Sequence, residues 1–135
     1  MSAGVAYLDA SAVVKLFKPE AESQRLASLL AGRELWMASE LTTVEAVCAA
    51  RRVGGEGMVA AAESVVARIE LIPFTEAIRE RACGSFSVSL RALDAVHAAT
   101  ALWVRDDIAL AMVYDADLRA ALEAEGLSVV APGPP

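Results

Sequence analysis

Short apolar runs alternate with longer segments of helical periodicity along the whole chain, and this alternation constrains the fold more than any other feature. The short runs are rich in β-branched and large apolar residues, which predicts strands at 5–8, 35–38, 69–74, 108–114 and 127–131. Strands that alternate with amphipathic helices are typical of a parallel sheet with crossover connections. We therefore predict an α/β fold with a mainly parallel central sheet flanked by helices.

The segments between these strands have the apolar spacing of helices. The segment "AESQRLASLLAG" places Leu26, Leu29 and Leu30 on one face and ends at a glycine. Apolar residues recur over 58–69 at offsets 0, 4, 7, 8 and 11. The segment "LDAVHAATALW" is apolar nearly all round, and "ADLRAALEAEG" follows the fourth strand. We expect these helices to cover the sheet, the third of them buried on most sides.

The chain of 135 residues has no internal repeat and no linker that would divide it. Prolines stop regular structure in the final "APGPP", so we expect one domain over 1–131 and a short tail over 132–135. The apolar runs are too short to span a bilayer and the start lacks the basic region of a signal peptide, so we expect a cytoplasmic protein without membrane association. We expect Cys48 and Cys83 to be buried thiols and not a disulfide.

Acidic residues stand where two of the predicted strands end. Asp9 follows the first strand in "VAYLD", and Asp115 follows the fourth in "LAMVYD". Ligands of open parallel sheets bind outside the carboxyl ends of the strands, so both carboxylates are expected at one edge. Two acids at the rim of a buried sheet repel each other and are poorly solvated, a cost that a bound cation would offset.

Two further acids interrupt apolar helical faces. In "SELTTVEAVCAARR" the residues at offsets 0, 3 and 7 predict a stripe that faces the core: Leu41, Val44 and Cys48. Glu45, at offset 4, is then expected on the core-facing side. Asp94 opens the apolar helix "LDAVHAATALW", and His97 follows one turn later on the same face.

Each of these residues also has a purely structural explanation. Asp9 and Asp115 can be N-caps of the helices that follow them, and Asp94 suits a first helical turn because of the helix dipole. Glu45 can extend to solvent from a helix edge, and His97 can be a core histidine with satisfied hydrogen bonds. Taken together, however, the acids form an all-oxygen set of the kind that Mg²⁺ or Mn²⁺ prefers. Such a set suits phosphoryl or phosphodiester transfer.

At these residues the sequence resembles the PIN-domain family, and within it the VapC-type toxin ribonucleases. The matching segments follow the family's order and cover nearly the whole chain: "YLDASAVVKLF", "SELTTVEAVCAARR", "LRALDAVHAATAL" and "VYDADLRAALEAEGLSVVAPG". The resemblance implies a PIN-like α/β/α sandwich and a metal-dependent endoribonuclease that uses Mg²⁺ or Mn²⁺. It also implies an RNA substrate, a cognate antitoxin and a homodimer.

The resemblance carries the family's catalytic and metal-binding acids onto Asp9, Glu45, Asp94 and Asp115. Ser11 matches a hydroxyl residue that often supports the first acid, though it is also an N-cap candidate. Asp117 follows the last acid by two positions and is a possible helper. The chain departs from the family at Val113, where many relatives have Thr or Ser, so a hydroxyl is missing near the last acid.

The formal net charge of −6 argues by itself against a polyanionic partner such as RNA. The chain has 18 acidic and 12 basic residues, so setting the four site acids aside leaves 14 acidic against 12 basic. The remaining surface is nearly neutral, and net charge therefore does not exclude RNA. Arg51, Arg52 and Arg91 each lie near a motif and are candidates for weak contacts with phosphates, although exposed arginines are often only solvated surface.

Two other functions fit parts of the pattern. Receiver domains and haloacid-dehalogenase-like phosphatases also place an Asp after the first strand, but they need a lysine late in the chain, and the only lysines here are Lys15 and Lys18. The other is a degenerate PIN-like binding module without catalysis. The complete acidic quartet speaks against it, because a module that only binds has no need of an intact site. Nuclease activity that requires Mg²⁺ or Mn²⁺ and is lost with a chelator would distinguish the enzyme from the binding module.

Overall fold

The computed structural model describes residues 4–134. One sheet has the strand order β3-β2-β1-β4-β5, and every neighbouring pair in it is parallel. The strands are β1 (Val5–Leu8), β2 (Leu35–Ser39), β3 (Glu70–Ile72), β4 (Leu110–Met112) and β5 (Val129–Val130). The parallel sheet is thus confirmed. The last three strands are shorter than predicted. The length of a strand is set by how many of its residues pair with a neighbouring strand, and the apolar run can extend beyond that paired part.

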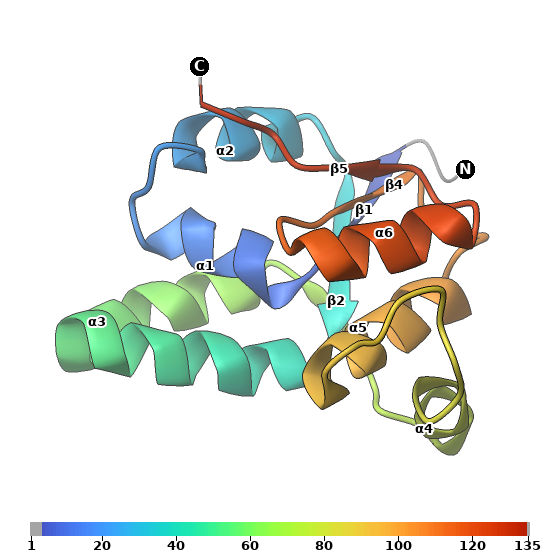
Figure 1. Cartoon of the computed structure of the whole chain (residues 1–135). Coiled ribbons are helices and arrows are strands. Elements are labelled where there is room, and N and C mark those ends of the chain that lie inside the picture. Colours follow the sequence, from blue (N-terminus) through green and yellow to red (C-terminus); the bar gives the residue numbers. More distant parts are fainter. Residues whose placement is uncertain (1–3, 135) are drawn as a thin grey trace.

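Helices cover both faces of the sheet. They are α1 (Ala10–Phe17), α2 (Ser23–Ala31), α3 (Leu41–Val66), α4 (Glu76–Ala82), α5 (Ala92–Trp103) and α6 (Ala116–Ala124). One face packs against α1, α2 and α3, the other against α5 and α6, and α4 packs on α5 (Figure 1). This arrangement is the α/β/α sandwich that the sequence predicts.

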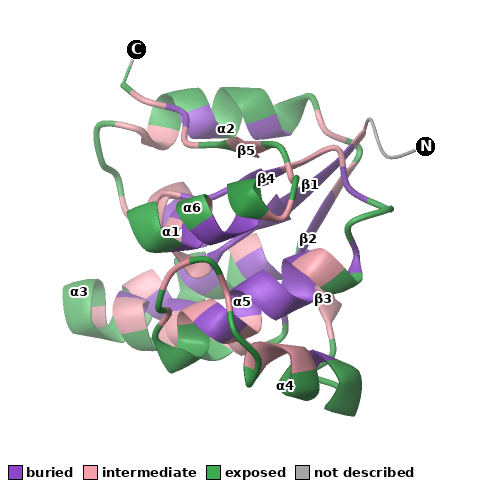
Figure 2. Ribbon diagram, turned by 45° about the vertical axis from the view of Figure 1, so that its right-hand side comes forward, coloured by how far each residue is buried: buried purple, intermediate pink, exposed green. Residues whose placement is uncertain are grey.

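Each central strand contributes to two apolar cores, since successive side chains point to opposite faces of a sheet. In β1, Ala6 and Leu8 pack with α1, α2 and α3, whereas Val5 and Tyr7 pack with α5 and α6. All four residues are buried, and β1 is coloured as buried in Figure 2. Burial on both faces explains why the strands are continuously apolar.

The first half of α3 buries a different face from the one predicted. Its buried residues are small: Thr42, Ala46 and Ala50. In contrast, Val44 is 61% exposed and Cys48 is also exposed. The predicted core-facing stripe of Leu41, Val44 and Cys48 is therefore wrong. Small side chains face the core here because α1 packs against this part of α3.

The second half of α3 is a separate helical segment, as its own periodicity predicts. The backbone leaves helical geometry at Gly54, with φ −141°, and at Gly55, with φ 64° and ψ −153°. Only glycine adopts such a positive φ with this ψ at low cost. The two glycines therefore set the bend that carries α3 back toward β3.

Both cysteines are free and exposed, Cys48 on α3 and Cys83 at the end of α4. The prediction that they are buried is wrong, because each lies on the side of its helix that is turned away from the core. Within residues 4–134, no helix combines the length and apolar content needed to cross a bilayer. The division into a domain over 1–131 and a tail over 132–135 stays a prediction. Residues 1–3 of that domain and residue 135 of that tail lie outside the described residues.

Candidate active site

Asp9 lies where β1 ends and the chain turns into α1. Its Oδ1 accepts a hydrogen bond from the backbone N–H of Ala12 at 3.0 Å and so caps the helix. Its backbone N–H donates to the carbonyl of Met112 at 3.3 Å, which ties it to β4. Asp9 is only 3% exposed. Aspartates are rarely buried to this extent without a charged partner, so capping alone does not account for its position.

Ser11 connects the ends of the two strands that carry acids. Its hydroxyl donates to the Asp9 carboxylate, with Oγ 2.7 Å from Oδ1 and 2.8 Å from Oδ2. The same Oγ accepts a hydrogen bond from the backbone N–H of Tyr114 at 3.2 Å. Tyr114 directly precedes Asp115, so Ser11 fixes the end of β1 relative to the segment that leaves β4.

Asp115 begins α6 and caps it. Its Oδ1 accepts a hydrogen bond from the backbone N–H of Leu118 at 2.9 Å. Val113, which stands where the family often has a hydroxyl residue, is buried in the core formed with α5 and α6. The missing hydroxyl is thus replaced by core packing, and the Asp115 carboxylate takes its hydrogen bond from the backbone of α6.

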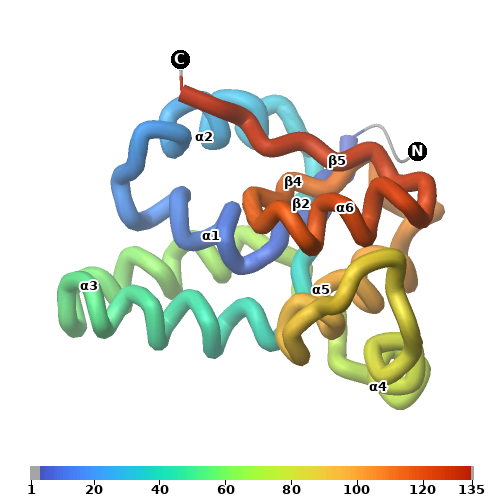
Figure 3. The backbone as a smooth tube through the Cα atoms, viewed as in Figure 1, coloured from blue at the N-terminus to red at the C-terminus, as the bar shows by residue number. Residues whose placement is uncertain are grey.

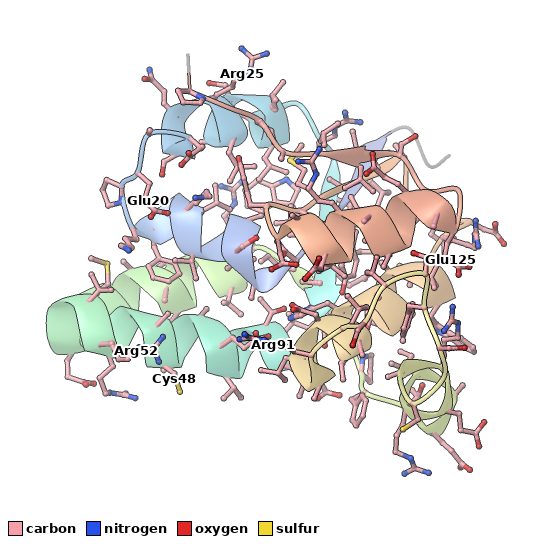
Figure 4. The ribbon with its side chains drawn as sticks, viewed as in Figure 1. Glu20, Arg25, Cys48, Arg52, Arg91 and Glu125 are labelled. Atoms are coloured by element: carbon pink, nitrogen blue, oxygen red, sulfur yellow. The ribbon has the colours of Figure 1, made fainter. Side chains whose placement is uncertain are left out.

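Asp94 shares a cavity with Asp115. It lies in the first turn of α5, and the cavity between α5 and α6 has a volume of about 480 Å³. Asp117 and Arg91 also line this cavity. Figure 4 shows Arg91 near the start of α5. One guanidinium therefore lies in a cavity with three carboxylates, where it partly balances their charge.

Glu45 reaches the site from α3 and pairs with His97 of α5. Its Oε1 lies 2.6 Å from Nε2 of His97, and because a carboxylate only accepts hydrogen bonds, the ring nitrogen is the donor. The His97 side chain is 2% exposed and that of Glu45 is 24% exposed. The carbonyl of His97 accepts a hydrogen bond from the buried Tyr7 hydroxyl at 3.2 Å. The sequence suggested only a core role for His97. Its place one helical turn after Asp94 was the feature that could have indicated a contact with the site acids.

The site acids influence one another's protonation. Burial raises the pKa of Asp9 to about 6, and the charge of Asp94 adds to this shift. The pKa of Asp94 is also raised, first by burial, then by the charge of Asp115 and to a smaller extent by that of Glu45. Asp94 is therefore coupled electrostatically to each of the other three acids.

The structure brings the four acids to the carboxyl edge of the sheet, and three of them line two cavities there. Asp94 and Asp115 line the smaller one, while Glu45 and Ser11 line a larger cavity of about 770 Å³. Asp9 is buried behind Ser11. Among residues 4–134, no three Asp, Glu, His or Cys side chains are placed so that together they could hold one metal ion directly.

The three candidate arginines lie in different surroundings. Arg91 lines the smaller cavity and Arg52 the larger one. Arg51 lines neither of these cavities, and its Nε donates to Oε2 of Glu56 at 2.8 Å on the exposed surface of α3. Arg52 and Arg91 are therefore better placed than Arg51 to meet a phosphate near the acids.

Comparison with known proteins gives the family. A model of the PIN domain matches residues 6–123 of this chain. The chain belongs to the PIN-domain family. Ribonuclease VapC35 of Mycobacterium tuberculosis is 44% identical over 131 residues, which cover 94% of this chain and 96% of that protein. Ribonuclease VapC46 of the same organism is 35% identical over 126 residues, which cover 93% and 96%.

Solved structures of VapC-type proteins share the PIN fold of this chain. VapC20 of Mycobacterium tuberculosis, a sarcin-ricin loop cleaving toxin, aligns with a TM-score of 0.74 at 20% identity, covering 94% of this chain and 99% of that one. A toxin-antitoxin complex from Klebsiella pneumoniae aligns with a TM-score of 0.69 at 22% identity, covering 96% and 99%. VapBC2 of Rickettsia felis, bound to promoter DNA, aligns with a TM-score of 0.70 at 12% identity, covering 95% of this chain and 98% of that one. At these identities the likeness supports the fold alone.

Asp9→Asn is expected to raise the free energy of unfolding of the metal-free protein at pH 8 by roughly 1–3 kcal/mol. The fold raises the pKa of Asp9 from 3.8 to about 6, so the charged form costs stability. That cost is fully present above about pH 6 and absent below about pH 4, and the advantage of Asn should shrink as the pH falls between these values. Urea unfolding in EDTA at several pH values measures the difference.

Asp106→Asn provides the matched control, since Asp106 is an exposed acid in the turn after α5. It should change stability little at any of these pH values. An Asp9→Asn protein that is less stable than the unmodified protein at pH 8 would contradict the assigned cost of burying this carboxylate.

Proposed function

We propose that this chain is a metal-dependent endoribonuclease that hydrolyses phosphodiester bonds of RNA, and that it is the toxin of a toxin-antitoxin pair. The observation that carries the proposal is that four acids lie at one sheet edge and that Asp94 is coupled electrostatically to each of the other three, which are Asp9, Glu45 and Asp115. Relatives named ribonuclease VapC, which this chain matches over almost its whole length, support the class of reaction.

The donor set fits Mg²⁺ or Mn²⁺, because hard divalent cations prefer carboxylate oxygens. Asp9, Asp94 and Asp115 would hold the ion, in part through water, since these side chains do not already meet at direct bonding distance. Such an ion lowers the pKa of bound water and neutralises charge that develops on the phosphate. Its positive charge would also offset the cost of burying Asp9.

Glu45 has a separate task in this proposal, which is to orient the attacking water and accept its proton. A carboxylate suits this task because it accepts hydrogen bonds without donating any. His97 binds Oε1, which leaves Oε2 for the water. Because His97 is buried and its backbone is bonded to Tyr7, it holds Glu45 in one orientation. His97 is therefore a positioning residue and not the base.

The larger cavity suits a segment of the antitoxin. Its apolar lining is partly exposed to solvent, with Val44 at 61%, Val53 at 50% and Leu93 at 48%. Arg52 lines the same cavity, as does Lys15, which pairs with Glu20 and Glu22. A segment lying there would cover Glu45 and block the site. The solved toxin-antitoxin complexes with this fold support such a partner for this chain.

A homodimer is part of the proposal because the helices leave apolar surface uncovered. Trp103, at the end of α5, is 60% exposed and Phe74 is 40% exposed. The two residues lie on different segments of the chain, and each is a candidate for a contact with a second copy. Neither residue lines the two site cavities.

Purified protein is expected to cleave single-stranded RNA with Mg²⁺ or Mn²⁺ and to lose this activity in EDTA. Asp94→Asn removes one charge with little change of shape and should lower the rate at least about 100-fold. Asp106→Asn, outside the site, should cleave like the unmodified protein. Gel assays of a labelled RNA measure these rates. Undiminished cleavage in EDTA would refute the metal mechanism, and RNA binding without cleavage would support the binding-module alternative.

His97→Leu is expected to lower kcat about 10- to 100-fold, because Glu45 loses the hydrogen bond that orients it. KM for RNA should change little, since His97 is buried and does not line either cavity. His97→Gln keeps an N–H donor close to the Nε2 position and should recover most of the rate. Gln cannot act as a base, so recovery also separates positioning from proton transfer. A folded His97→Leu protein with full activity would contradict this role.

A further inference from the structure

A third cavity, away from the acids, is lined by arginines. It has a volume of about 530 Å³ and lies between α2, α6, β5 and the segment that follows β5. Its basic residues are Arg25, Arg33 and Arg119. Figures 1 and 3 show β5 and the final segment running beside α2, and Figure 4 shows Arg25 on this helix.

The charge in this cavity is segregated. Among the described residues that line it, none is Asp or Glu, although the chain has 18 acidic and 12 basic residues. A hollow with basic and no acidic lining residues favours an anion over a cation.

Arg119 supplies an independent observation. Its Nε is buried and has no hydrogen-bond partner among the described residues. Buried donors in proteins are almost always paired, so an unpaired Nε marks a place that a ligand atom or water completes. Arg119 stands one helical turn after Asp115, whose carbonyl accepts its backbone N–H at 3.0 Å. The cavity therefore begins within one turn of the candidate active site.

Tyr114 joins the arginine-lined cavity to the acids. Its hydroxyl donates to the carbonyl of Pro132, a residue of the cavity wall, at 2.7 Å. Its backbone N–H donates to Ser11 beside Asp9. The ammonium of Lys15 lies 4.6 Å from the centre of the Tyr114 ring. This ammonium also pairs with Glu20 at 3.1 Å and Glu22 at 3.2 Å, so Tyr114, through its two hydrogen bonds, is the link between the site acids and the cavity wall.

We propose that the arginine-lined cavity binds two phosphate groups of the RNA strand beyond the bond that is cut, an inference that rests on the proposed function for its choice of partner. Guanidinium groups make paired hydrogen bonds with phosphate oxygens. The cavity also offers apolar surface to a ribose or base, with Leu29 at 42% and Val130 at 36% exposure. A protein of net charge −6 needs such a local cluster to retain a polyanion near its acids.

The test is RNA binding without cleavage. A fluorescent single-stranded RNA of about 12 nucleotides is titrated with protein in EDTA at several salt concentrations. Arg25→Gln combined with Arg119→Gln should weaken binding about 10-fold and lower the slope of log K against log salt by about 1.4, since each lost phosphate contact contributes about 0.7. Arg79→Gln, on the exposed side of α4, is the control and should change neither quantity.

Cleavage kinetics separate this inference from the proposed function. The double variant should show a raised KM for RNA at unchanged kcat. RNA binding that depends on the two arginines in a protein that never cleaves RNA would support this inference while refuting the proposed function.

Two results would overturn the inference. One is a folded double variant whose affinity for RNA and salt slope equal those of the unmodified protein. The other is an equal loss of affinity for a poly-glutamate peptide, which would assign the cavity to an acidic protein partner. If the double variant does not fold, Arg25→Gln alone decides, because Arg25 is exposed: its salt slope should fall by about 0.7, and an unchanged slope overturns the inference.

Discussion

The buried carboxylate of Asp9 is the group on which the site depends. Hydrogen bonds from Ser11 and the N–H of Ala12 hold it and begin α1, yet burial still raises its pKa to about 6. Asp115 also caps a helix after a strand, yet it is exposed. Capping a helix at this edge therefore does not require a buried carboxylate. The position of Asp9 therefore makes most physical sense if a cation balances its charge when the protein works.

The site also lies where the two helical layers of the sandwich meet. Glu45 comes from α3 on one face of the sheet, while Asp94 and His97 come from α5 on the other. The hydrogen bond between Glu45 and His97 joins the two layers at the carboxyl edge. Rigid packing of both layers on one sheet thereby sets the spacing of the acids, which is what a reaction that depends on orientation requires.

Much of the fold is predictable from the chain because a strand covered on both faces is a continuous apolar run. The prediction of 5–8 matches β1, and the places of Asp9 and Asp115 follow from where strands end. The buried face of α3 is not predictable in this way, because close packing against α1 selects small residues over larger apolar ones. The contact between Glu45 and His97 joins residues 52 positions apart and depends on how the layers pack. The arginine-lined cavity likewise brings together residues that are far apart in the sequence. The arginines chosen from the sequence as RNA contacts were those next to motifs, so this cavity was not predicted.

A crystal structure of the protein grown with Mn²⁺, with the ion located by anomalous scattering, tests the central claim most directly. We predict an anomalous peak at the carboxyl edge of the sheet, bound by Asp9, Asp94 and Asp115 either directly or through water. A crystal of protein that cleaves RNA with Mn²⁺ but shows its ion at a different place, or no ion among these acids, would contradict the claim.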